Sequence, residues 1–90
     1  MLINFGKKFS KKYDRSPAHI KEATKKRLEL FKQNPFNPLL NNHALTGQYL
    51  GYRSIDITGD WRAIFSEYQS EGGEKIVIFE LINTHSELYG

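Results

Sequence analysis

The apolar residues of this chain change their period once, and that change restricts the fold more than any other feature. Before residue 35, apolar side chains recur every three or four residues, which is the spacing of one helix face. From Tyr52 onward they alternate with polar residues and are rich in β-branched and aromatic types, which is typical of strands. Helices followed by a run of strands predict the α+β class.

Local signals divide the first half into elements. The apolar start, residues 1–5, predicts a strand, and residues 7–14 predict a short basic helix. Ser16 is expected to be the N-cap of a second helix with Pro17 in its first turn, and this helix should end before Pro35.

The second half is expected to begin with an irregular crossing segment, residues 35–51, which contains one short helical turn near Leu39 and Leu40. Three strands should follow as a meander, at residues 52–57, 60–68 and 75–82.

The predicted order is therefore β-α-α-β-β-β, in a single domain that covers residues 1–90. We expect an antiparallel sheet with a helical hairpin packed on one face and the first strand at a sheet edge. Ninety residues are enough for one hydrophobic core. The chain has no cysteine, so no disulfide can brace the fold and no redox compartment is indicated. It has no apolar run of signal-peptide or membrane-spanning length, so a cytoplasmic protein is expected.

Positive charge is concentrated in the predicted helices. Ten of the 13 basic residues lie between Lys7 and Lys32, against three acids, so this segment carries a net charge of +7 while the rest carries −4. Such a surface attracts polyanions, with nucleic acid the commonest, and Lys25 and Lys26 are candidate RNA contacts. A solvated helix face or an acidic protein partner would explain the same charges.

Four polar residues are expected to meet at one end of the sheet. If the last two strands pair through the Gly-Gly pair within residues 71–74, as a two-residue turn or a four-residue loop, Asp60 lies opposite His85 and Arg62 opposite Asn83. Opposed and alternate residues share a face, so all four would cluster. A slip of one residue would separate them.

This cluster suits cleavage of RNA by its own 2′-hydroxyl. The reaction needs a base, an acid and a cation that stabilises the transition state. His85 has an intrinsic pKa suited to acid or base work, Asp60 can orient it, and the Arg62 fork fits phosphate oxygens. Tyr89 can donate a proton or stack on a base, and His43, in a loop, is a candidate second acid or base.

Each of these residues also has a structural interpretation. His85 near the end of the chain can simply be exposed, and Asp60 after a glycine suits a turn. Arg62 can form an ion pair with Glu80 or Asp60, and Trp61 alternates as a core residue would.

Four short motifs sharpen these alternatives. Residues 43–47 (HALTG), 51–54 (GYRS), 59–65 (GDWRAIF) and 84–90 (THSELYG) resemble, in this order and spacing, the YafQ-like branch of the RelE toxin superfamily. The resemblance implies a RelE-like fold and a toxin that cleaves messenger RNA on the ribosome. No metal or other cofactor is expected, because the His and Asp residues lack the ligand spacing of a zinc or two-metal site. The resemblance also implies a cognate antitoxin, and operator DNA bound through the toxin-antitoxin complex.

The resemblance also assigns residues. It implies catalytic roles for His43, Asp60 and His85, and a further functional position at Trp61. Tyr89 matches the C-terminal aromatic residue of the family. Arg62 matches an arginine that RelE itself carries on its third strand.

Two positions depart from the pattern. Asp56 stands where YafQ-like toxins have a histidine, and Leu81 stands where related toxins have an arginine, with Asn83 nearby. Arg62 or Arg53 can supply the missing positive charge, because stabilisation depends on where the charge lies.

Two other functions remain open at this stage. The ParE branch shares the fold and poisons DNA gyrase without nuclease chemistry. A degenerate toxin would bind its antitoxin and operator DNA but cleave nothing, and Leu81 and Asp56 favour this alternative. The C-terminal motif, residues 85–89, argues against the ParE branch.

Overall fold

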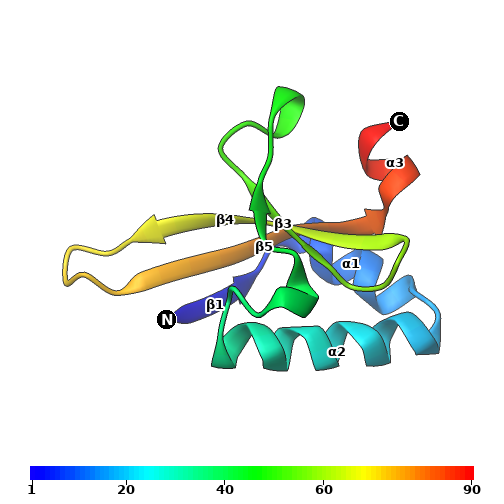
Figure 1. The fold of residues 1–90 in the computed structure, drawn as a ribbon, viewed down its shortest axis with the longest axis horizontal. Coiled ribbons are helices and arrows are strands. Elements are labelled where there is room, and N and C mark those ends of the chain that lie inside the picture. The colour runs from blue at the N-terminus through cyan, green and yellow to red at the C-terminus, as the bar shows by residue number, and fades with distance from the viewer.

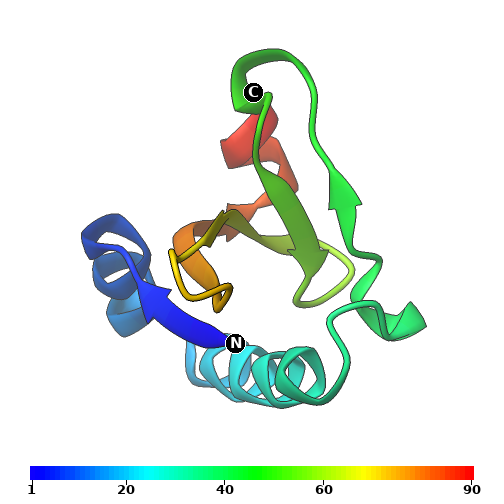
Figure 2. The same ribbon diagram turned by 90° about the vertical axis from the view of Figure 1, so that its left-hand side faces the viewer.

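The computed structural model describes all 90 residues and has one five-stranded sheet with two long helices on one face (Figures 1 and 2). The strand order across the sheet is β1-β5-β4-β3-β2. The elements are β1 (Leu2–Phe5), α1 (Lys7–Arg15), α2 (Ala18–Gln33), β2 (His43–Ala44), β3 (Arg53–Asp56), β4 (Trp61–Gln69), β5 (Lys75–Thr84) and α3 (His85–Tyr89), with short 3-10 turns at Pro38–Leu40 and Gly47–Tyr49.

The predicted α+β class and the predicted β-α-α-β-β-β order are confirmed, with two additions and one correction. The additions are the two-residue strand β2 and the C-terminal helix α3. The correction concerns β1, which lies at an edge as expected but pairs parallel with β5, so the sheet is mixed and not purely antiparallel.

The boundary between the two long helices lies where the sequence predicts it, but Ser16 acts differently. The Ser16 hydroxyl donates a hydrogen bond to the carbonyl oxygen of Lys12 at 2.6 Å, so it closes the end of α1 and does not cap α2. The second helix begins after Pro17 and buries Ile20 and Phe31. Proline separates the helices because its ring favours an extended residue before it.

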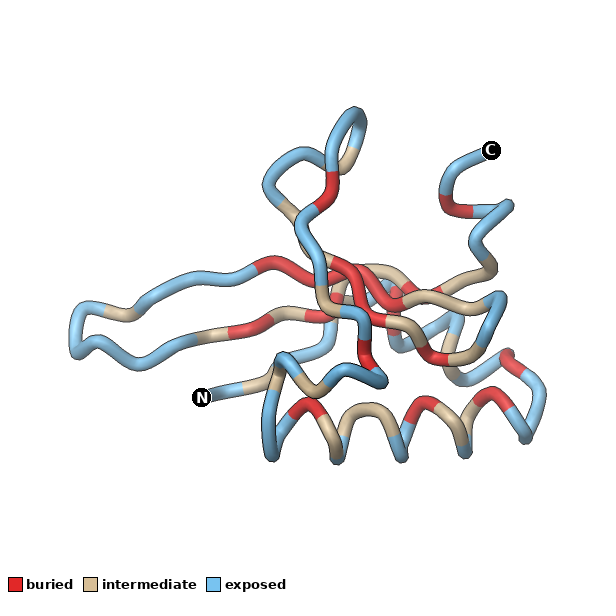
Figure 3. The backbone as a smooth tube through the Cα atoms, viewed as in Figure 1, coloured by how far each residue is buried: buried red, intermediate tan, exposed pale blue.

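The main core lies between the helices and one face of the sheet. Phe9, Phe31, Phe65 and Phe79 form its centre, and the ring centroid of Phe31 lies 5.2 Å from that of Phe65 and 5.3 Å from that of Phe79, edge to face. Figure 3 shows the buried residues along the crossing strands and the inner side of α2. Fully burying a side chain such as Phe31 contributes about 1.5–3 kcal/mol.

A smaller apolar cluster lies on the opposite face of the sheet. It consists of Leu45, Ile64 and Leu88, with Leu81 packed against it. It attaches α3 and the loop between β2 and β3 to this face, and both rise from the sheet away from α2 (Figure 1). Leu81 therefore packs in an apolar cluster, and this position supplies no cation.

β4 pairs with β5 in the predicted register at the end of the sheet that contains Arg62 and Asn83. Arg62 lies opposite Asn83, as expected. The turn was predicted wrongly, because Gln69 pairs with Lys75 and the loop between them closes with three residues at its tip. An extra residue in β5, Glu80, forms a bulge between Phe79 and Leu81 and restores the expected register beyond it.

Candidate active site

The face of the sheet opposite α2 carries a polar groove of about 460 Å³. Its walls are the loop that contains β2 on one side and α3 on the other, and β3 and β4 form its floor. The polar side chains that line it are Asn41, His43, Thr46, Ser54, Arg62, His85 and Tyr89.

Strand alternation decides which residues reach this groove. Ile55 and Ala63 belong to the helix-side core, so Ser54 and Arg62, one position earlier on each strand, point to the other face. His43 on β2 lies opposite Ser54, which brings it to the same face. The hydroxyl of Ser54 is buried at the floor of the groove, where it interacts with the phenol of Tyr89.

The Arg62 side chain is held by the turn between β3 and β4. Its Nη1 atom lies 3.0–3.2 Å from the carbonyl oxygens of Thr58, Gly59 and Trp61. Its Nε atom lies 3.0 Å from Oδ1 of Asp56 as an ion pair, although the N–H is not aligned for a hydrogen bond. Of the expected ion-pair partners, Glu80 and Asp60, neither pairs with Arg62.

His43 is oriented by the backbone. Its Nδ1 atom lies 2.7 Å from the carbonyl oxygen of Asn41. A carbonyl only accepts hydrogen bonds, so Nδ1 carries the proton in this contact and Nε2 is left as the basic nitrogen of the neutral ring. Asn41 adopts the left-handed conformation, with φ 48°, a geometry that asparagine tolerates better than most residues.

The helix α3 brings two further groups to the groove. His85 and Tyr89 lie one helical turn apart, and their ring centroids are 4.7 Å from each other. The Thr84 hydroxyl caps the helix by accepting the Glu87 N–H at 3.2 Å. The carbonyl oxygen of Leu88 accepts hydrogen bonds from Tyr49 and Gln48 of the facing loop, which fixes the helix end.

The surroundings of Tyr89 raise the pKa of its phenol, which is protonated at neutral pH as in any tyrosine. Burial raises the pKa of its phenol above the ordinary value, and the neighbouring Tyr49 and Asp56 act in the same direction. The Ser54 hydroxyl and the Arg62 guanidinium lower that pKa without cancelling the rise. At neutral pH the phenol is therefore a hydrogen-bond donor.

Asp60 reaches the site through its backbone and not through its carboxylate. Its carbonyl oxygen accepts the N–H of His85 at 2.8 Å, which agrees with the predicted pairing of these two residues. Its side chain is exposed and does not line the groove.

The remaining candidate residues lie away from the groove. Trp61 is half-buried against the helix-side core, where the Lys12 ammonium lies 5.7 Å from its ring centroid. Arg53 donates a hydrogen bond to Asn42 at 2.8 Å and is not among the groove residues. The two lysines predicted to contact RNA, Lys25 and Lys26, are exposed on α2.

Sequence reasoning missed three contributors, Ser54, Thr58 and the carbonyl oxygen of Asn41. Ser54 and Asp56 are alternate residues on one strand and so share a face of the sheet, and this spacing is the sequence signal that could have placed Ser54 beside Arg62. Thr58 accepts hydrogen bonds from the N–H groups of Asp60 and Trp61, at 3.2 and 3.0 Å, and so shapes the turn.

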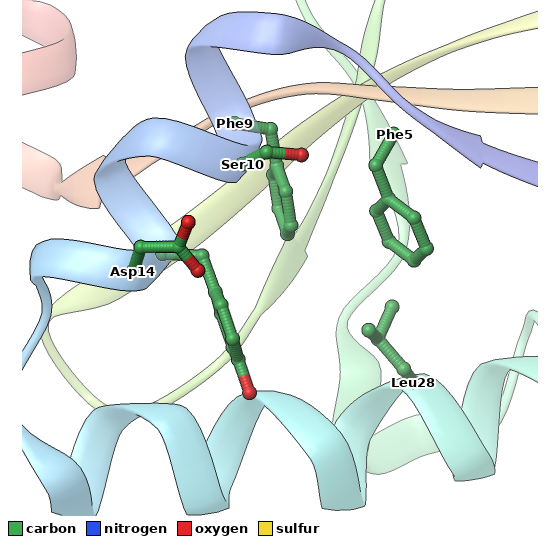
Figure 4. A pocket seen from close by; sticks show the side chains of 6 residues that line it. Phe5, Phe9, Ser10, Asp14 and Leu28 are labelled. Atoms are coloured by element: carbon green, nitrogen blue, oxygen red, sulfur yellow. The ribbon is translucent and has the colours of Figure 1, made fainter.

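A smaller hollow of about 270 Å³ lies between α1 and α2 (Figure 4). It is lined mainly by apolar side chains, including Phe5, Phe9 and Leu28, and Asp14 is its only charged residue. It therefore lacks the groups that acid-base chemistry needs. Elsewhere, no three His, Asp or Glu side chains lie together as metal ligands would, and none of the helices has the length and apolarity to cross a membrane.

Several solved structures with a similar fold are described as toxins. YafQ from E. coli strain BL21(DE3) is similar at 24% identity and a TM-score of 0.76, covering 98% of this chain and 97% of that chain. The YoeB/ParE toxin from Agrobacterium tumefaciens is similar at 24% identity and a TM-score of 0.75, covering 94% and 99%. A chain of the RelB-RelE antitoxin-toxin complex from Methanococcus jannaschii is similar at 24% identity and a TM-score of 0.67, covering 96% and 94%.

The fold of this chain is therefore that of the RelE-like toxins. Residues 2–90 match the family described as bacterial toxin of type II toxin-antitoxin system, YafQ. The chain belongs to this YafQ family. No curated protein matches the sequence.

Proposed function

We propose that this toxin is an endoribonuclease that cleaves messenger RNA on the ribosome, and that the polar groove is its active site. One observation carries the proposal: two imidazoles, a guanidinium and a neutral phenol from three separate elements line one groove. These residues are His43, Arg62, His85 and Tyr89.

The groups match the needs of cleavage by the 2′-hydroxyl. The Nε2 atom of His43 takes the 2′ proton, the 2′ oxygen attacks phosphorus, and His85 gives a proton to the leaving 5′ oxygen. The products are a 2′,3′-cyclic phosphate and a 5′-hydroxyl. Proton transfer by such groups typically contributes about 10²–10⁴-fold to the rate.

Arg62 and Tyr89 stabilise the phosphorane-like transition state. The three carbonyl oxygens around Nη1 hold the guanidinium before substrate arrives, so little reorganisation is needed. The phenol of Tyr89 donates a hydrogen bond or stacks on a base, beside the His85 ring.

The other candidate residues act at a distance from the reacting atoms. Asp60 positions His85 through its carbonyl oxygen, and Trp61 supports the same turn from the core side. Arg53, Lys25 and Lys26 contact RNA outside the groove, with the basic helices gripping ribosomal RNA.

We further propose a cognate antitoxin as the protein partner and the cytoplasm as the site of action. The Methanococcus jannaschii neighbour is an antitoxin-toxin complex, with RelB as the antitoxin. The complex of this chain with its antitoxin would bind operator DNA.

The proposal is tested by inducing the toxin in cells without its antitoxin and mapping the 5′ ends of translated messages. In-frame cuts that disappear in a His85→Ala variant would support the nuclease. Growth arrest with intact messages would indicate a gyrase poison, and the absence of arrest would indicate a degenerate toxin. A need for added metal, or cleavage of single-stranded DNA, would contradict the mechanism.

A further inference from the structure

A second groove lies beside the candidate active site on the same face of the sheet. It has a volume of about 420 Å³, and its charged and aromatic lining consists of Lys7, Lys8, Tyr49, Tyr52 and Glu80. The lysines come from the start of α1 and the tyrosines from the loop between β2 and β3.

The two grooves are neighbours across an aromatic pair. Tyr49 lines the second groove and Tyr89 the first, and their rings meet edge to face with centroids 5.6 Å apart. Below them, Arg62 and Ile64 are alternate residues on β4, so the two floors are separated by about 6.6–6.8 Å along the strand. The aromatic pair and the hydrogen bonds from Gln48 and Tyr49 to the Leu88 carbonyl oxygen form a ridge between the two floors, so a strand that occupied both grooves would cross over these rings.

The lining of the second groove suits single-stranded nucleic acid. Lys7 and Lys8 are exposed, and neither ammonium is used in an ion pair. Tyr52 is half-buried, which leaves part of its ring open to the groove. Cations that neutralise phosphates and rings that stack on bases are the two elements of sequence-tolerant binding to single strands.

One acid opposes this charge. Glu80 lines the groove at the bulge of β5, and its carboxylate accepts a hydrogen bond from Ser66 at 3.0 Å. Two ammonium groups against one tethered carboxylate leave the groove with a positive balance.

We propose that this second groove is a subsite for single-stranded RNA, which holds the nucleotides next to the phosphate in the candidate active site. Lys7 and Lys8 bind backbone phosphates, and Tyr52 stacks on a base. The proposal rests on the proposed ribonuclease function and assigns the path of the substrate.

The test is the affinity of the full chain for a fluorescent hexanucleotide RNA that is 2′-O-methylated and so cannot be cleaved. The double variant Lys7→Ala/Lys8→Ala should bind about tenfold more weakly. The slope of its log affinity against log salt concentration should become shallower by about 0.7 for each phosphate that is no longer neutralised. The control, Lys75→Ala, removes a lysine on β5 that lies outside both grooves and outside the basic helices, and it should change affinity less than about threefold, because distant charges are screened.

A second pair of variants tests stacking. Tyr52→Phe keeps the ring and should retain affinity, whereas Tyr52→Leu should lose about fivefold or more. Equal losses in the lysine variant and its control, or no binding by the parent chain, would overturn the subsite. Unchanged RNA affinity with loss of antitoxin binding would also overturn it and assign the groove to the protein partner. If the Lys7→Ala/Lys8→Ala variant cleaves messages normally, the proposed subsite is contradicted while the proposed ribonuclease function still holds.

Discussion

Asp56 on β3 and Arg62 on β4 lie directly opposite each other, and Oδ1 of Asp56 is 3.0 Å from Nε of Arg62. Asp56, one of the two residues expected from the sequence to depart from the YafQ-like pattern, thus forms an ion pair with the cation of the groove. The carboxylate lowers the positive charge that the groove presents to a phosphate. Arg62 is nevertheless held in place independently, by three backbone carbonyl oxygens.

Replacing the acid by its amide, Asp56→Asn, should therefore accelerate cleavage. A phosphate would no longer compete with a carboxylate for Arg62, and a pair of this exposure is worth about 0.2–1 kcal/mol, or up to about fivefold. Single-turnover cleavage on stalled ribosomes measures the effect. Glu67→Gln, which breaks the 2.7 Å pair with Lys75 on the distant hairpin, is the matched control and should change nothing. Slower cleavage by Asp56→Asn would show that the acid positions Arg62.

The Thr58 hydroxyl should matter for both stability and activity. Thr58→Val removes an acceptor from two backbone N–H groups and should cost about 1–2 kcal/mol of unfolding free energy. Cleavage should also fall, because this turn holds Arg62 and the N–H of His85. Thr58→Ser keeps the hydroxyl and should behave like the parent chain in urea unfolding and in the cleavage assay. Equal cleavage by the valine and serine variants would show that the Thr58 hydroxyl does not contribute to activity.

Because Glu80 is the extra residue of the bulge in β5, the fold should tolerate deletion of this residue. Removing Glu80 leaves Phe79 opposite Phe65 and Leu81 opposite Ile64, so all side chains keep their faces. We expect cooperative thermal unfolding to persist. Removing Ile78 instead would move Glu80 into the core position of Phe79, and a cooperative transition should be lost. Similar melting curves for both deletions would contradict this account of the register.

The ionisation of Tyr89 should make the free energy of unfolding of this protein depend on pH in the alkaline range. Burial raises the pKa of the phenol in the folded chain above that in the unfolded chain, so the contribution of Tyr89 is fully present below the unfolded pKa. It is lost as the pH rises through the folded pKa, because the unfolded chain ionises first. The free energy of unfolding should thus fall less steeply with alkaline pH in Tyr89→Phe than in the parent chain. Parallel urea-unfolding profiles in the two proteins would show that the pKa of Tyr89 is the same in the folded and unfolded chains.

The sequence alone was enough to predict the order of elements, because helical and strand periods are local properties. It also predicted the family, through four short motifs, and placed Arg62, Asn83 and His85 at one end of the sheet. The register was right although the turn was wrong, since the Glu80 bulge compensated for the three-residue loop tip. Periodicity contains no signal for such a bulge.

Only the tertiary structure decided which side chains meet. It placed Trp61 on the helix side and left the carboxylate of Asp60 outside the groove, and it paired Arg62 with Asp56. It also created α3, which holds His85 and Tyr89 against a loop that is far away in sequence. These outcomes depend on strand pairing and on contacts between distant segments, whereas composition and period report only what each segment prefers by itself.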